Sequence, residues 1–173
     1  RPATYQKVRL TGLKPDTVYT YRLEGNGYSA GPFTFRTAPL GNKSFRFAAY
    51  GDTRTQHDIH REIIEKVLSQ KPALALHTGD LVADGREIEQ WEQFFQISQP
   101  LIQSVPLYPA LGNHEMDSPL YFRFFSLPGN ERYYSFDWGA CHFICLNSNE
   151  PYLAEPSQLQ WLQEDLQRHK DSP

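Results

Sequence analysis

The chain has 173 residues, of which 39% are hydrophobic and 14% aromatic, and its formal net charge at pH 7 is −3. This composition is typical of a globular protein with one domain, or one domain and part of another, and it excludes a disordered chain. The small net charge offers no basic surface for nucleic acid or for an anionic membrane, and no apolar stretch approaches the length of a membrane span.

The first 39 residues have the pattern of antiparallel β structure. Three segments alternate between apolar and polar residues, and glycines or a Lys-Pro-Asp-Thr turn separate them. They are YQKVRLTGL (5–13), VYTYRLEG (18–25) and GPFTFRTAP (31–39). Because three strands are too few to close a sandwich, we predict that residues 1–39 are a partial antiparallel β-sandwich module. A linker at about 39–42 would join it to the rest of the chain, residues 40–173.

From residue 44 onward, apolar strands alternate with helical segments, which predicts an α/β fold. The strands are too apolar to have one solvent-facing side, so we expect a parallel sheet covered on both faces. A hairpin and a closing helix are predicted after it. The expected elements are strands at 45–52, 72–80 and 106–113, a helical segment with Ile59, Ile63, Ile64, Val67 and Leu68 on a common face, a helix at about 86–103, hairpin strands at 133–139 and 140–147, and a helix at 156–169.

Three of these strands end in the same way, with a glycine followed by an oxygen-bearing side chain: Asp52, Asp80 or Asn113. Ligands bind outside the carboxyl ends of the strands in an open parallel sheet, so these side chains should converge in one crevice. Two carboxylates, an amide oxygen and nearby histidines suit Mn, Fe or Zn better than a thiolate-binding metal. The alternative is that these residues only cap helices and form turns.

The sequence here resembles a known family. GDTR (51–54), GDLVAD (79–84) and GNHE (112–115) are similar to the first three motifs of the calcineurin-like metallophosphoesterases. Residues 7–39 resemble the end of the fibronectin type III-like module that precedes the catalytic domain of purple acid phosphatases. The resemblance implies a layered metallophosphoesterase fold, with mixed β sheets flanked by helices, of which residues 40–173 would be the N-terminal part.

The resemblance also implies a metal-dependent phosphoesterase that hydrolyses phosphate esters with water activated by two divalent metal ions (Mn, Fe or Zn). Asp80 would bridge the two ions, with Asp52 on one and Asn113 on the other. His114 would touch substrate and either stabilise transition-state charge or protonate the leaving oxygen. Glu115 would orient His114. The substrate would be a small phosphate ester or a phosphoprotein.

The family's later histidine motifs would follow residue 173, so the chain is expected to be a fragment that is nearly inactive by itself. The resemblance favours a secreted or periplasmic protein, although the chain shows no signal peptide. A second reading is a catalytically degenerate binding module that keeps the metallophosphoesterase fold. The continuation of the gene, or an assay with phosphatase and diesterase substrates, would separate the two.

Two positions depart from the family pattern and bear on the metal. Ala83 stands where purple acid phosphatases carry the tyrosine that colours their iron, so no phenolate is expected. Arg54 stands where simpler phosphoesterases have a histidine, and it either pairs with a substrate phosphate or lies in a surface loop. His57 and His60 follow closely and could replace a missing ligand, although His60 more naturally sits on the helix as a polar residue.

Three further histidines have simpler explanations. His77 lies inside an apolar strand and His142 alternates with apolar residues in another, so we expect both to be core histidines with satisfied hydrogen bonds. His169 is near the end of the last predicted helix, where a positive charge is favoured by the helix dipole. None of the three is predicted to bind a metal.

Overall fold

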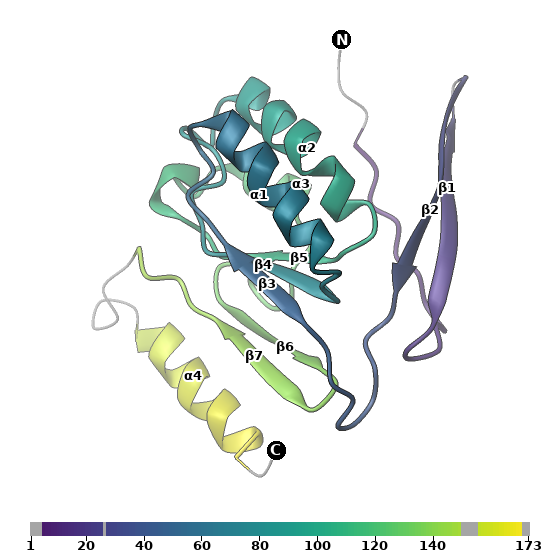
Figure 1. Cartoon of the computed structure of the whole chain (residues 1–173). Coiled ribbons are helices and arrows are strands. Elements are labelled where there is room, and N and C mark those ends of the chain that lie inside the picture. The colour runs from purple at the N-terminus through teal and green to yellow at the C-terminus, as the bar shows by residue number, and fades with distance from the viewer. Residues whose placement is uncertain (1–4, 26, 150–155, 171–173) are drawn as a thin grey trace.

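A computed structural model describes residues 5–25, 27–149 and 156–170. Most of the chain forms four layers (Figure 1): helices α1 and α2, a parallel sheet, a β-hairpin that forms the second sheet, and helix α4. A separate hairpin near the N-terminus stands beside these layers. The prediction of a layered α/β fold is confirmed.

The parallel sheet contains β3 (Phe47–Tyr50), β4 (Leu74–His77) and β5 (Leu107–Pro109), in the order β3-β4-β5. The helices α1 (His57–Ser69) and α2 (Ile88–Ile102) cover one face, where their apolar sides meet the sheet. The buried side chains of this interface are Ile64, Ala75, Ile97, Leu101 and Val105. The near-continuous apolar character of β4 follows from this position, because the strand is buried on both faces.

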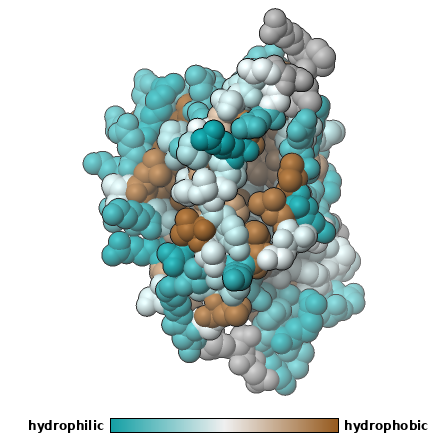
Figure 2. Space-filling view, turned by 90° about the vertical axis from the view of Figure 1, so that its right-hand side faces the viewer, coloured by the Kyte–Doolittle hydropathy of each residue, from teal (hydrophilic) through white to brown (hydrophobic). Residues whose placement is uncertain are grey.

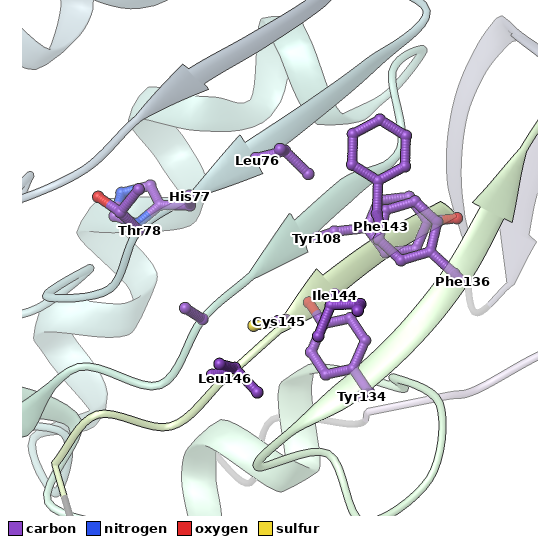
Figure 3. Close-up of a pocket in the computed structure, with 11 residues that line it drawn as sticks. Leu76, His77, Thr78, Tyr108, Tyr134, Phe136, Phe143, Ile144, Cys145 and Leu146 are labelled. Atoms are coloured by element: carbon purple, nitrogen blue, oxygen red, sulfur yellow. The ribbon is translucent and has the colours of Figure 1, made fainter. Parts of the chain in front are cut away.

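The other face of the sheet is covered by a second sheet. β6 (Tyr134–Trp138) and β7 (Cys141–Cys145) pair antiparallel as predicted, and α4 (Pro156–Arg168) packs on their outer side. Aromatic rings join the two sheets: the Tyr108 and Phe136 centroids are 3.7 Å apart and nearly parallel, at 7°. Figure 3 shows these rings beside a mainly apolar cavity of about 220 Å³ between the sheets.

A compact aromatic core lies between α2 and α3 (Pro119–Phe124). Trp91 and Tyr121 are both fully buried, and Phe94 and Phe125 pack against Trp91. The Trp91 indole N–H donates to the Gly85 carbonyl at 2.8 Å, so its one polar group is satisfied. This core therefore supports the loop that follows β4.

The N-terminal β module differs from the prediction. Within the described residues of this module, 5–25 and 27–39, two strands form, β1 (Val18–Gly25) and β2 (Tyr28–Arg36), and they pair antiparallel. The expected strand at 5–13 does not form, and its polar side chains bind the end of α3 instead of a neighbouring strand. Tyr5 donates its hydroxyl to the Phe124 carbonyl at 2.9 Å, and the Lys7 ammonium donates to the Phe125 carbonyl at 2.7 Å.

The hairpin β1–β2 is tied to the layers and also carries exposed apolar groups. The Tyr21 hydroxyl donates to the Gln103 carbonyl at 2.9 Å, just after α2. Figure 2 views this side and shows several hydrophobic patches between polar side chains. Val18 and Leu23 on β1 are 57% and 51% exposed. Among the described residues, no helix combines the length and the apolar character needed to cross a membrane.

Candidate functional site

The carboxyl ends of β3 and β4 bring Asp52 and Asp80 together. The guanidinium Nη1 of Arg54 donates to Asp52 Oδ1 at 2.5 Å and to Asp80 Oδ2 at 2.7 Å. Two backbone bonds fix the loops, since Asp52 N–H donates to the Gly79 carbonyl and Arg54 N–H to the Asp80 carbonyl, both at 3.1 Å. The two carboxylates therefore converge on one cation. Arg54 is not a free surface arginine, because it pairs with both of them.

The loop after β5 contacts the Asp80 carboxylate through a backbone N–H group. Asn113 begins the 3₁₀ helix η1 (Asn113–Glu115), and the N–H of His114 donates to Asp80 Oδ1 at 3.2 Å. A Cβ on Gly112 would lie 2.2 Å from the Asp80 nitrogen and 2.3 Å from its Oδ1, so only glycine fits. Gly79 has a φ of +100°, a backbone conformation that residues with a Cβ rarely adopt. The loops carrying all three predicted metal ligands thus meet at one edge of the sheet, although Asn113 itself is exposed.

Both carboxylate residues have an unusual backbone. Asp52 and Asp80 adopt the left-handed conformation, with φ of 56° and 58°. Residues with a Cβ rarely take this conformation, which costs about 1–2 kcal/mol. Such strain is typical of functional sites, where the surrounding structure holds a side chain in a required direction. Here it turns both carboxylates outward from the strand ends.

Glu115 has a different role from the one predicted. Its side chain is fully buried, and its carboxylate accepts four backbone N–H bonds. The donors are Asp80 (3.0 Å), Leu81 (2.8 Å), Val82 (3.3 Å) and Gly112 (2.7 Å). Burial raises the pKa of Glu115 above its ordinary value, while these N–H groups act in the opposite direction. The carboxylate therefore fastens the loop after β4 to the loop after β5.

His114 is oriented by the backbone and not by Glu115. Its Nδ1 lies 2.7 Å from the Ala83 carbonyl, and its own carbonyl accepts the Gly85 N–H at 2.9 Å. A carbonyl can only accept, so Nδ1 carries a proton and Nε2 remains for another partner. The expectation that Glu115 orients His114 is therefore wrong. The loop residue Ala83 fixes the ring through its backbone, while its side chain supplies no phenolate.

A cavity of about 280 Å³ lies beside Arg54, which pairs with both carboxylates, and includes the histidine at the start of α1. Arg54, His57 and Ala83 line it. The Nδ1 of His57 is buried without a hydrogen-bond partner among the described residues, so it is available to a ligand. His60, in contrast, lies away from this cavity. Its ring stacks on Phe94 at 5.7 Å, and burial lowers its pKa to about 4.

His77 is a satisfied core histidine, as predicted. The Gly79 N–H donates to its Nδ1 at 3.3 Å, which leaves the proton on Nε2, 2.9 Å from Thr53 Oγ1. The Thr53 hydroxyl donates in turn to the Leu81 carbonyl at 3.3 Å. Burial lowers the pKa of His77 to about 3. This neutral chain of hydrogen bonds stiffens the loops behind Asp52 and Asp80.

Two supporting residues were not predicted from the sequence. Thr53 bonds to His77, and Gln90 on α2 accepts the N–H groups of Ala83 and Asp84, at 2.8 and 2.9 Å. Both residues hold the loops that carry the candidate ligands. Thr53 had one available signal, its position directly after Asp52. Nothing in the sequence marks Gln90, because its partners are backbone N–H groups and no particular residue type is needed opposite it.

Residues 45–172 match the sequence pattern of the calcineurin-like phosphoesterases. The chain therefore belongs to the calcineurin-like phosphoesterase family. Its relatives include purple acid phosphatase 21 of Arabidopsis thaliana, which is 30% identical over 93% of this chain and 39% of that protein. Probable inactive purple acid phosphatase 9 from the same plant is 26% identical over 60% of this chain and 22% of that protein.

A solved structure of a purple acid phosphatase from yellow lupin (Lupinus luteus) seeds has the same fold. It aligns with a TM-score of 0.76 and 22% identity, over 91% of this chain and 34% of that chain. The layered metallophosphoesterase architecture is thereby confirmed. The present chain spans about two fifths or less of the length of these proteins.

Proposed function

We propose that this chain carries part of the active site of a metal-dependent phosphoesterase. The observation that carries the proposal is the convergence of Asp52 and Asp80 on one cation, the Arg54 guanidinium, at the end of the sheet where Asn113 also emerges. A cation-binding carboxylate pair is what a divalent metal needs, and family membership supports the same chemistry.

The donor set fits a pair of hard or borderline metal ions. Asp80 offers one carboxylate oxygen toward Arg54 and the other toward the loop of Asn113, which suits a bridging ligand. Asp52 would bind one ion and Asn113 the other. Bound ions of this kind supply Lewis acidity toward phosphate oxygens and lower the pKa of water. Mn, Fe and Zn all accept such ligands, and Ala83 provides no phenolate that would favour ferric iron.

The remaining residues would act on the substrate. The His114 ring is held through Nδ1, so Nε2 faces the site, and as an imidazolium the ring would donate from Nε2 to a leaving oxygen or to a phosphate oxygen that gains charge. Arg54 is already 2.5 Å from Asp52 and would turn to a phosphate oxygen once metal ions neutralise the carboxylates. Glu115 would keep the strand-end loops at the required spacing. The cavity beside His57 would receive part of a phosphate ester, as a small molecule or a phosphoprotein side chain.

A second function, a catalytically inactive binding module, is favoured by one observation. The Arg54 guanidinium already occupies the space between the two carboxylates, where it would compete with a metal ion. In that case the site would bind a phosphate group without hydrolysing it.

Metal binding and turnover, measured together, distinguish the two functions. The chain should bind Mn²⁺ or Zn²⁺ weakly and hydrolyse a chromogenic phosphomonoester or diester slowly in excess metal. Asp80→Asn should abolish both, whereas Asp58→Asn, which removes an exposed carboxylate on α1, should leave both unchanged. Arg54→Gln should strengthen metal binding. Hydrolysis equal in the wild type and Asp80→Asn would refute the enzyme, and phosphate binding in both would support the binding module.

We also propose that residues 1–39 are the end of a fibronectin type III-like module. The antiparallel hairpin β1–β2 and its stacked ring pair, Tyr19 and Phe35 at 5.7 Å, are consistent with two neighbouring strands of such a sandwich. A longer form of the protein with further strands before residue 5 should bury Val18 and Leu23. Hydrogen–deuterium exchange and surface labelling would detect this as lower exchange and lower labelling at β1 than in the 173-residue chain.

A further inference from the structure

A second group of metal-ligating side chains lies at the opposite end of the molecule from the strand-end site. Asp137 is the last residue but one of β6, His142 is the second residue of β7 and pairs with Asp137 across the hairpin, and His169 follows α4. Figure 1 shows the β6–β7 turn and the C-terminal end of α4 on the far side from the carboxyl ends of β3 and β4. The sequence assigned none of these residues to a ligand site.

The geometry of the three side chains suits a single ion. Each offers one ligand atom, and these atoms all lie within 4.8 Å of one another, with His142 Nδ1 and Asp137 Oδ1 at 2.6 Å. In a tetrahedral zinc site with bonds of about 2.0–2.1 Å, ligand atoms lie about 3.3 Å apart. The 2.6 Å spacing is shorter than that value and no spacing exceeds 4.8 Å, so side-chain rotations would place all three around one ion.

Each histidine has one ring nitrogen held by Asp165, and the second nitrogen of His142, Nδ1, bonds to the candidate ligand Asp137. His142 Nε2 lies 2.7 Å from the Asp165 carboxylate, and His169 Nδ1 lies 2.8 Å from the Asp165 carbonyl. Metal-binding histidines almost always donate one ring N–H to a carboxylate or carbonyl and bind the metal through the other nitrogen. At His142 the ion would replace the proton that lies between Nδ1 and Asp137. The two rings also stack, with centroids 3.7 Å apart, so they lie side by side.

Asp165 is itself firmly held and buried, with a side chain that is 3% exposed. Ser135 Oγ donates to its Oδ1 at 3.1 Å and Arg168 Nη2 donates to the same oxygen at 3.2 Å. One residue of α4, Asp165, therefore positions both rings, His142 through its carboxylate and His169 through its backbone carbonyl. The candidate ligand Asp137 is in contrast 64% exposed, so an ion can enter from solvent.

We propose that Asp137, His142 and His169 bind one divalent transition-metal ion of the zinc type. Two imidazole nitrogens and one carboxylate oxygen form a borderline ligand set, which suits Zn²⁺ and its neighbours and not Mg²⁺ or Ca²⁺. Three protein ligands leave one position for water. The ion would join the end of α4 to the β6–β7 hairpin, so it would stabilise the contact between helix and sheet.

The test follows the imidazole resonances of the whole 173-residue chain by ¹H–¹⁵N correlation NMR while Zn²⁺ is added. Ring signals assigned with His142→Gln and His169→Gln separate this site from the strand-end site. The expected result is a saturable shift of both rings, with coordination at Nδ1 of His142 and Nε2 of His169. Asp137→Asn should weaken the affinity read from these signals by at least about tenfold, while Asp58→Asn leaves it unchanged.

The wild-type titration requires no variant to fold, and Asp137 is exposed enough for its replacement to be tolerated. The proposal is overturned if both rings keep their signals while Zn²⁺ binds only at the strand-end site. It is also overturned if Asp137→Asn and Asp58→Asn give the same affinity at His142 and His169. A rise in melting temperature with Zn²⁺ that is lost in His169→Gln would support it further.

Discussion

Replacing Glu115 with glutamine should destabilise the protein strongly although the change is nearly isosteric. Oε1 accepts the N–H groups of Leu81 and Val82, and Oε2 accepts those of Asp80 and Gly112. In Glu115→Gln one oxygen becomes an NH₂ group, so two buried N–H donors lose their acceptor. Each unsatisfied buried donor costs about 1–3 kcal/mol, which gives a loss of about 2–6 kcal/mol in the free energy of unfolding.

Urea denaturation at pH 7, followed by far-UV circular dichroism, measures this loss. Glu164→Gln is the matched control, because its exposed carboxylate accepts only from the Gln160 side chain and should change stability by less than about 0.5 kcal/mol. If Glu115→Gln lost less than about 1 kcal/mol, the carboxylate would not be the group that fastens the two loops. Metal affinity at the strand ends should fall with stability in the same variant, since loop spacing sets the ligand positions.

Three further outcomes follow from the structure. Gly112→Ala should lower the melting temperature and weaken metal binding measured by titration calorimetry, because its Cβ would lie 2.2 Å from the Asp80 nitrogen. Trp91→Ala should cost about 3–5 kcal/mol in urea denaturation, since the side chain is fully buried among aromatic rings. The pKa of His60 is about 4, below the unfolded value, so the unfolded state binds the extra proton. Stability should therefore fall as pH drops from about 6.5 to 4, by up to about 1.4 kcal/mol per unit for this group, and His60→Gln should flatten that slope in urea titrations at several pH values.

The sequence predicted those features that depend on local pattern. The strand–glycine–acid repeat placed Asp52 and Asp80 together because parallel strands end at one edge, and this follows from topology alone. The hairpin β6–β7 was predicted from alternation around a glycine turn. The segment at 5–13 has the same alternation but forms no strand, because alternation cannot show whether a neighbouring strand is present.

The role of Glu115 could not be predicted for a different reason. Its partners are backbone N–H groups from two other loops, and every non-proline residue has one, so the sequence does not mark them. The group of Asp137, His142 and His169 was not predicted because Asp165, on α4, is 23 residues from His142 and only the packing of α4 on the hairpin brings His169 close. In the sequence, His142 fits a core position and His169 fits a helix C-terminus, so neither residue alone indicates a shared site.

The left-handed backbone at Asp52 and Asp80 has a consequence for directed evolution. At φ of 56° and 58°, glycine or asparagine would have less backbone strain than aspartate. Replacing either aspartate would therefore raise thermal stability but remove a carboxylate from the site. A library selected only for survival at high temperature should lose these acids early. A selection that also demands metal retention should keep them and gather its compensating changes elsewhere in the protein.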